Sequence, residues 1–153
     1  MTGRAVTRAI PGSVLFACTE NALRSPMAEA MMKHLHGRQV FVDSVGVRAG
    51  ALDGFAIEVM TELGLDISRH TPKAFEELED TSFDLIVSLS PEAQHSAVEL
   101  TRSSAAEIEF WPTFDPSIID GGREERLQAY REVRDAILDR IRERFSVAPA
   151  AHT

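Results

Sequence analysis

The fold is decided by a short stretch near the N-terminus, which reads VLFACTENALRSP over residues 14–26. Residues 13–17 form a short apolar run with β-branched and aromatic members, a composition that favours a strand. The Ser-Pro pair at 25–26 then opens the segment 27–35 (MAEAMMKHL), whose residues favour a helix. The stretch therefore predicts a strand, a loop and a helix in direct succession, with Cys18 just beyond the strand.

The same alternation of strands and helices continues along the rest of the chain. Further strands are predicted at 39–45, 83–89 and 107–111, and further helices at 55–63, after Ser90-Pro91-Glu92 and at 124–145. Gly64 is expected to end the second helix. The pattern predicts an α/β fold, a single three-layer domain with a four-stranded parallel sheet and helices on both faces. We expect this domain to span residues 13–145, with flexible tails at 1–12 and 146–153.

Composition and charge exclude several classes of protein. The chain has 153 residues, enough for one domain, and 24 Asp and Glu against 16 Lys and Arg give a net charge of -8. This charge disfavours nucleic acid and anionic membrane surfaces as partners. The apolar runs fall short of the roughly 20 residues of a membrane span, and a lone cysteine, Cys18, can form no internal disulfide. We therefore expect a cytoplasmic protein. The five histidines show no metal-ligand spacing, so no metal and no cofactor are expected.

The loop from Cys18 to Arg24 joins a strand end to a helix start, where phosphate chemistry can be carried out. Successive backbone N–H groups in such a loop, reinforced by the helix N-terminus, form a concavity for a dianion, and Arg24 adds a bidentate clamp. A thiolate beneath the phosphate can attack phosphorus in line and give a phosphocysteine, which water then hydrolyses. The alternative reading is a buried structural cysteine with Arg24 on the surface.

A family resemblance extends this interpretation. The stretch VLFACTENALRSPMAEAMMKHL resembles the opening of the low-molecular-weight protein tyrosine phosphatases, a family shared by related arsenate reductases, and the match runs from about Val14 to Phe145. It implies Cys18 as nucleophile and Arg24 as ligand of the phosphate and the transition state. It also implies that Asn21 holds the shape of the loop and that Ser25 donates to the thiolate. The residues expected to bind substrate are Thr19, Glu20, Asn21, Ala22, Leu23 and Ser25.

A second motif supplies the acid that the reaction needs. Asp115-Pro116, in FWPTFDPS, is similar to the family's Asp-Pro loop, whose carboxylic acid protonates the leaving group. Taken alone, Asp before Pro more often marks a turn. Paired with the Cys18 loop, Asp115 is expected to be the general acid.

The sequence also departs from the family pattern. Glu20 stands where the resemblance leads us to expect glycine, which predicts a carboxylate near the bound dianion and a non-glycine residue at positive φ. Leu23 replaces the second cysteine that is common before the arginine. The segment 47–55 lacks the aromatic wall that the family places beside the substrate ring. Three residues are candidates for a differently shaped mouth, although each also fits as a surface charge or a core aromatic: Arg48, Phe55 and Trp111.

Together these features predict a phosphomonoester hydrolase of the protein tyrosine phosphatase type, acting through a phosphocysteine on Cys18 with Asp115 as general acid. Two alternatives stay open. One is an arsenate reductase that uses an external thiol, because the chain lacks further cysteines. The other is a non-catalytic module that binds phosphate or phosphoprotein. The expected partner is a phosphorylated protein or a small phosphate monoester, without nucleic acid or membrane, and the chain is expected to be a monomer or weak dimer.

Overall fold

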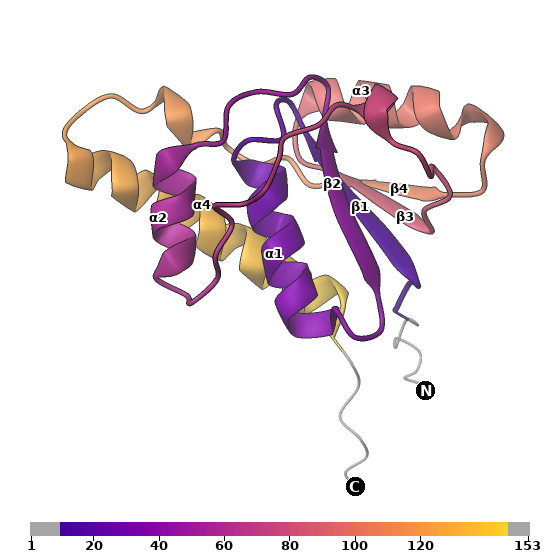
Figure 1. The fold of residues 1–153 in the computed structure, drawn as a ribbon, viewed down its shortest axis with the longest axis horizontal. Coiled ribbons are helices and arrows are strands. Elements are labelled where there is room, and N and C mark those ends of the chain that lie inside the picture. Colours follow the sequence, from indigo (N-terminus) through magenta and orange to yellow (C-terminus); the bar gives the residue numbers. More distant parts are fainter. Residues whose placement is uncertain (1–9, 147–153) are drawn as a thin grey trace, which may run out of the picture.

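The computed structural model describes residues 10–146, in which four parallel strands alternate with four α-helices (Figure 1). In chain order the elements are β1 (Ser13–Cys18), α1 (Arg24–His36), β2 (Phe41–Gly46), α2 (Gly54–Thr61), β3 (Leu85–Ser88), α3 (Pro91–Leu100), β4 (Glu107–Phe110) and α4 (Arg123–Arg144). Short 3₁₀ helices, which the sequence did not predict, are η2 (Phe75–Glu77), η3 (Thr101–Ser103) and η4 (Pro116–Ile118). The predicted alternation is confirmed.

The sheet has the strand order β2-β1-β3-β4, and every pairing is parallel. At the carboxyl end of the strands Cys18 lies opposite Gly46 of β2, and its neighbour Ala17 lies opposite Ser88 of β3. Because β1 is flanked by a strand on each side, the loop that follows it emerges from the middle of the sheet. This is the edge at which parallel sheets bind ligands.

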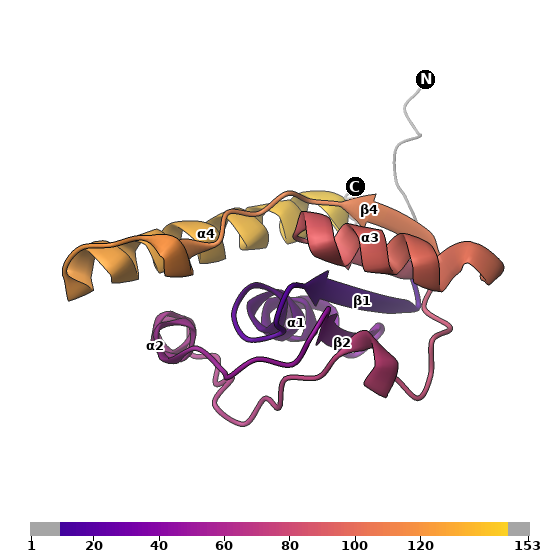
Figure 2. The ribbon, with the colours of Figure 1, turned by 90° about the horizontal axis from the view of Figure 1, so that it is seen from above.

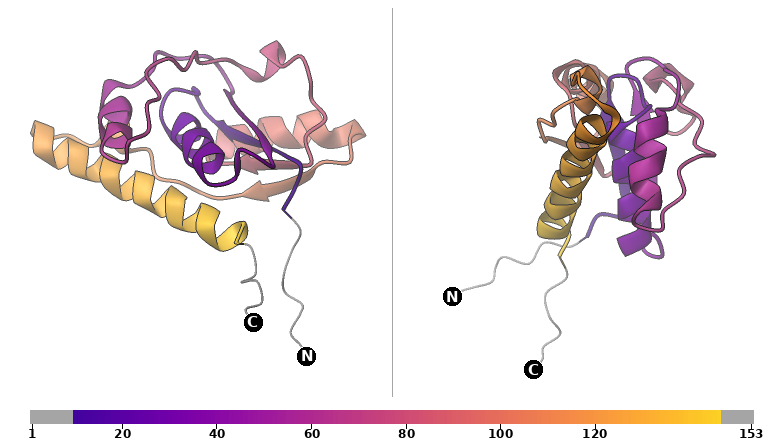
Figure 3. Two further views of the ribbon diagram at one scale, coloured as in Figure 1. Left: turned by 60° about the horizontal axis from the view of Figure 1, so that its bottom comes forward. Right: turned by 90° about the vertical axis from the view of Figure 1, so that its left-hand side faces the viewer.

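Helices cover both faces of the sheet, as predicted. Side chains of β1 alternate between them: Val14 and Phe16 pack with α1, α2 and α4, whereas Leu15 and Ala17 pack with α3. Figure 2 shows α2 and α3 on opposite sides of β1, and Figure 3 shows α4 alongside α1 and α2. The two-residue period of the strand therefore supplies two separate cores.

Local signals fix the ends of α2. Asp53 is its N-cap, and Oδ1 accepts the backbone N–H groups of Phe55 at 2.8 Å and Ala56 at 3.2 Å. At the other end Gly64 adopts a φ of 77°, and the N–H of Leu65 donates to the carbonyl of Met60 at 3.1 Å. The N–H of Gly64 donates to the carbonyl of Thr61 at 2.9 Å, so this closing turn is a Schellman motif with glycine in the left-handed position. The predicted role of Gly64 is confirmed.

The last helix, α4, carries one arginine that is buried against α2. Arg134 is only 7% exposed, although the alternation of Arg with Glu and Asp along this segment is typical of a solvated face. Its Nη1 donates to the carbonyl of Val59 and to Oε1 of Glu62, each at 2.8 Å. Arg134 therefore joins α4 to the end of α2, where helix carbonyls lack partners within the helix. The sequence pattern could not distinguish this arginine from its exposed neighbours.

The predicted tails, 1–12 and 146–153, lie mostly outside the described residues. Of the first, residues 10–12 are described, and they contact the fold: Ile10 packs against the larger core, while Gly12 donates to Asp84 Oδ2 and accepts from the N–H of Phe41, both at 2.9 Å. Among the helices within residues 10–146, none combines the length and the apolar character that crossing a membrane would require.

Candidate active site

The loop from Cys18 to Ser25, called here the phosphate loop, links the end of β1 to the first turn of α1. Cys18 is the last residue of β1 and is 2% exposed, and Arg24 is the first residue of α1. The Sγ of Cys18 lies 2.8 Å from Oγ of Ser25 and accepts the Ser25 backbone N–H at 3.4 Å. The only thiol of the chain is thus placed at the start of a helix, against a hydroxyl and an amide donor.

Backbone carbonyls of the phosphate loop point outward into hydrogen bonds with the segment that follows β2. The pairs are Cys18 with the N–H of Val47, Thr19 with Arg48, Glu20 with Gly50 and Ala22 with Asp53, at 2.9–3.1 Å. Within residues 10–146, by contrast, the backbone N–H groups from Thr19 to Arg24 have no protein acceptor. With carbonyls bonded on the outside and amides left unpaired, the loop has the character of an anion-binding nest.

Asn21 gives the loop its shape. Its φ is 54°, and among residues 10–146 it is the single non-glycine residue with positive φ. Its Nδ2 donates to Oγ of Ser25 and to Oγ of Ser44, both at 2.9 Å. Gly46 lies directly beneath: a Cβ there would come within 2.6 Å of the Asn21 nitrogen. The turn after β2 therefore has to be small for the loop to close.

Two residues that sequence reasoning missed complete this network. Oδ1 of Asn21 accepts the backbone N–H of Lys73 at 2.9 Å and lies 2.9 Å from Nε2 of His70. The other ring nitrogen of His70 is 3.8 Å from Oε1 of Glu29, and that oxygen accepts from Ser44 Oγ at 2.5 Å. Burial lowers the pKa of His70 and outweighs the opposing effect of the Glu29 carboxylate.

Nothing in the local sequence marks His70 or Lys73. Both follow α2 in an irregular segment, and they are 49 and 52 residues from Asn21 in the chain. Only the folded path of the chain brings them to the phosphate loop.

Arg24 connects the phosphate loop to the segment that holds Asp115. It is 9% exposed, and its Nη1 donates to the carbonyl of Thr113 at 2.8 Å. The N–H of Thr113 in turn donates to the carbonyl of Leu89, just beyond β3. The alternative of a surface arginine is therefore wrong for Arg24, and the two sequence motifs do come together at one edge of the sheet.

Asp115 itself begins the short helix η4. Its Oδ1 accepts from the backbone N–H of Ser117 at 3.0 Å and from Oγ of Ser117 at 2.7 Å, so the turn role that Asp-Pro pairs often have is present. Nearby, the hydroxyl of Tyr130 donates to Oδ2 of Asp53 at 2.7 Å. Burial and that hydrogen bond raise the pKa of Tyr130, and the charge of Asp115 adds to the effect. The Asp53–Tyr130 pair is itself bonded to the phosphate loop, because the N–H of Asp53 donates to the carbonyl of Ala22.

The structure corrects one expectation about Glu20. It does not adopt positive φ, because Asn21 takes that conformation instead. The Glu20 side chain is exposed and lies near Arg48. Ala22 and Leu23 are buried, at 7% and 8% exposure, and Leu23 packs into the larger core. Thr19 donates from Oγ1 to Oγ of Ser90, the N-cap of α3, at 3.0 Å.

Two of the residues considered for the mouth of the site have other surroundings. Trp111 is 3% exposed and makes an edge contact with the Phe16 ring, so it is a core residue. Phe55 meets the Tyr130 ring edge-on, and Arg126 lies over its face at 4.8 Å. Arg48 remains at the rim, paired with acidic side chains.

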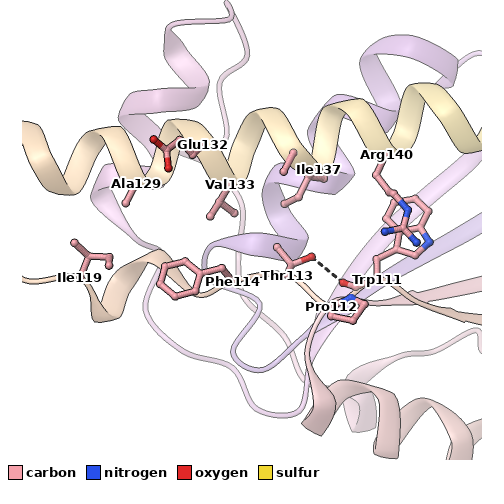
Figure 4. A pocket seen from close by; sticks show the side chains of 11 residues that line it. Trp111, Pro112, Thr113, Phe114, Ile119, Ala129, Glu132, Val133, Ile137 and Arg140 are labelled. Atoms are coloured by element: carbon pink, nitrogen blue, oxygen red, sulfur yellow. Dashed lines mark hydrogen bonds between the residues drawn. The ribbon is translucent and has the colours of Figure 1, made fainter.

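A separate pocket of about 410 Å³ lies between α4 and the segment that precedes Asp115 (Figure 4). Trp111, Thr113 and Phe114 form one side of it, and Val133 and Ile137 of α4 form the other. Thr113 Oγ1 donates to the carbonyl of Trp111 at 2.8 Å within this wall. The pocket is lined by neither the thiol nor the phosphate loop.

Comparisons with known proteins agree with the geometry. The chain is 33% identical over 130 residues to an arsenate reductase of Bacillus subtilis (strain 168), covering 85% of this chain and 92% of that protein. It is 30% identical over 128 residues to a glutaredoxin arsenate reductase of Synechocystis sp., covering 84% and 92%. Among solved structures, a low molecular weight protein tyrosine phosphatase from T. tengcongensis matches with a TM-score of 0.70 and 27% identity, covering 84% and 94%. The family model for low molecular weight phosphotyrosine protein phosphatases matches residues 13–147, and the chain belongs to that family of cysteine-dependent enzymes.

Proposed function

We propose that this protein is a phosphomonoester hydrolase, with phosphotyrosyl groups as its substrate class, and that Cys18 is the nucleophile. One observation carries the proposal: the chain has a single thiol, set in a loop whose carbonyls bond outward and whose amides are unpaired within the described residues. Such a site can bind a phosphate dianion directly above Sγ.

The first chemical step follows from this geometry. The Cys18 thiolate attacks phosphorus in line, the S–P bond forms as the P–O bond to the leaving group breaks, and the product is a phosphocysteine. The Oγ and N–H of Ser25 act as donors to the sulfur, at 2.8 and 3.4 Å. Arg24 is proposed to bind the equatorial phosphate oxygens as charge develops on them.

The general acid in this proposal is Asp115. Its carboxyl group gives a proton to the departing oxygen, and in the second step it takes a proton from the water that attacks phosphorus and releases inorganic phosphate. The hydrogen bond from Arg24 to the Thr113 carbonyl supports this role, because it holds the Asp115 segment against the phosphate loop.

The test is hydrolysis of aryl phosphates under reducing conditions. Cys18→Ser should abolish turnover of p-nitrophenyl phosphate. Asp115→Asn should slow phenyl phosphate far more than p-nitrophenyl phosphate, because nitrophenolate leaves without protonation. Phosphotyrosine and phosphoserine peptides of one sequence then test the substrate class. Equal loss with both aryl substrates would exclude Asp115 as the acid, and an inert wild-type protein would overturn the proposal.

A second candidate, arsenate reduction, is favoured by a specific observation: the curated relatives named above are arsenate reductases. In this reaction Cys18 would displace water from arsenate. Reduction to arsenite then takes two electrons from two thiols, which end as one disulfide. Cys18 can supply one of these thiols, so the other must be external, such as glutathione.

The two candidates are separated by one comparison. Arsenate-dependent oxidation of glutathione, followed with glutaredoxin as the coupled partner, should be lost in Cys18→Ser if the protein is a reductase. Turnover of phosphotyrosine peptide without arsenate-dependent thiol consumption would assign hydrolysis alone.

A further inference from the structure

Glu20 introduces a carboxylate into the phosphate loop, and its side chain lies against Gly50. A Cβ placed on Gly50 would come 2.7 Å from Oε1 of Glu20 and 2.9 Å from its Cβ. The Glu20 side chain is about half exposed, at 53%. Gly50 therefore leaves the space that the outward conformation of Glu20 occupies.

Arg48 meets this carboxylate from the same segment. Its Nε lies 3.7 Å from Oε2 of Glu20, and its Nη1 lies 3.5 Å from Oε2 of Glu92 in the first turn of α3. The backbone N–H of Arg48 donates to the Thr19 carbonyl at 3.0 Å, so the base of the side chain is fixed to the phosphate loop. We call Glu20, Arg48, Gly50 and Glu92 the charged rim.

The charged rim matters because a carboxylate beside a bound dianion weakens its binding. The repulsion falls with distance and with solvent screening, so an outward carboxylate paired with a guanidinium costs little, whereas one turned toward the anion costs much more. An exposed ion pair contributes little to folding. It can nevertheless decide which of two solvated conformations a side chain prefers.

We propose that Arg48 is a positioning residue that holds the Glu20 carboxylate over Gly50 and away from the anion, so that the phosphate loop binds a dianion although it carries an acidic residue. The inference rests on the proposed function only in that the loop binds phosphate. It requires no turnover. The ligand is the same phosphate dianion. The Arg48–Glu20 pair is expected to affect the binding of this dianion rather than the chemical step.

The experiment is a double-mutant cycle read by the dissociation constant of inorganic phosphate, measured by calorimetry at low salt. Arg48→Gln should weaken phosphate binding about three- to tenfold, and added salt should reduce the difference. The same substitution in a Glu20→Gln background should change the constant less than about twofold. Arg48→Lys should retain most of the affinity. Arg102→Gln, a matched loss of one exposed arginine paired with Glu99, should have no effect.

A second variant tests the steric half of the proposal. Gly50→Ala displaces the Glu20 side chain from its place and should weaken phosphate binding in the wild-type background but not together with Glu20→Gly. In an active enzyme Arg48→Gln and Gly50→Ala should each raise KM while kcat changes little, because neither substitution touches the groups that form and hydrolyse the phosphocysteine.

Each outcome separates this inference from the proposed function. If phosphate binding follows the cycle but no aryl phosphate is hydrolysed, only the proposed function fails. If turnover occurs and Arg48→Gln is equally harmful with and without Glu20, Arg48 acts on the anion directly and the inference fails. If the wild-type protein binds no phosphate, both are wrong.

Discussion

Asn21 donates a hydrogen bond from Nδ2 to Oγ of Ser25 across 2.9 Å, and both side chains are fully buried. Ser25 Oγ lies 2.8 Å from the sulfur of Cys18. The residue that bends the phosphate loop thus also holds the hydroxyl that faces the thiol. Loop conformation and thiol environment are consequently determined by one amide group.

Replacement of Asn21 by alanine is predicted to disturb both the conformation of the phosphate loop and the surroundings of the Cys18 thiol. The alanine would have to adopt positive φ, and the Lys73 N–H would lose its acceptor. Ser25 and Ser44 would each lose one donor. Buried groups left without partners typically cost about 1–3 kcal/mol each, so we expect a loss of roughly 2–4 kcal/mol in the free energy of unfolding. Urea titration measures this loss.

Asn21→Gly separates the cost of positive φ from the cost of the lost hydrogen bonds. Glycine accepts positive φ without strain but supplies no side-chain hydrogen bond. If Asn21→Gly is as unstable as Asn21→Ala, the hydrogen bonds dominate. If it matches wild type in stability and in Cys18 alkylation rate, the network assigned to Asn21 carries no weight.

Tyr130 is the only tyrosine of the chain, so its ionisation can be followed alone. Burial and the hydrogen bond to Asp53 raise its pKa above the ordinary value of 10.0. The folded state therefore keeps the proton more tightly than the unfolded state does. The stability from this pair is fully present below pH 10.0 and falls as pH rises toward the folded pKa.

We expect no phenolate absorbance at 295 nm from native protein at a pH where the urea-unfolded chain is ionised. Tyr130→Phe should remove the signal and should flatten the alkaline fall in stability. Ionisation of the native protein near pH 10.0 would contradict the hydrogen bond to Asp53.

The fold was readable from the sequence because each element carries a local signal. Apolar β-branched runs mark β1 and β3, and Gly64 marks the end of α2. The site was only partly readable. Cys18 and Arg24 belong to one continuous motif, whereas His70 comes from an irregular segment that has no periodic pattern.

The error over Glu20 has a physical cause. A missing glycine suggested that its replacement would need positive φ, but the left-handed residue is the next one, Asn21. Asparagine is among the few side chains that adopt this region readily. The space that lets the loop close comes from Gly46, which lies at the end of the neighbouring strand β2 and not in the loop. Such a long-range steric requirement leaves no mark on the loop sequence.

Arg134 is predicted to stabilise the α2–α4 contact more than its neighbour Arg131. Arg134 is 7% exposed and satisfies the Val59 carbonyl, whereas Arg131 bonds only side chains of the surface. Arg134→Ala leaves that carbonyl without its charged donor, and we expect a cost of roughly 2–3 kcal/mol in the free energy of unfolding. Arg131→Ala, with the same change in charge, should cost clearly less in the same urea titration. Equal losses would mean that the surface charge network, and not the buried hydrogen bond, holds the helices together.

His70 gives the protein a predicted sensitivity to acid. Burial lowers its pKa below the ordinary 6.5, and the charge of Lys73 lowers it further. The carboxylates of Glu29 and Asp43 raise the pKa but do not outweigh burial. Between the folded pKa and 6.5 the unfolded chain binds more protons than the folded one. The stability that the neutral ring contributes is therefore fully present above pH 6.5 and falls as the pH drops below it.

The test compares wild type with His70→Gln, which retains an amide donor for Asn21 but does not titrate. The free energy of unfolding of wild type, taken relative to that of the variant, should decline as the pH falls below 6.5 and should be constant above it. A relative stability that rises on acidification would mean that the ion pair with Glu29, at 3.8 Å, outweighs burial. The charged ring would then be the form that supports Asn21, and the phosphate loop would be firmest in acid.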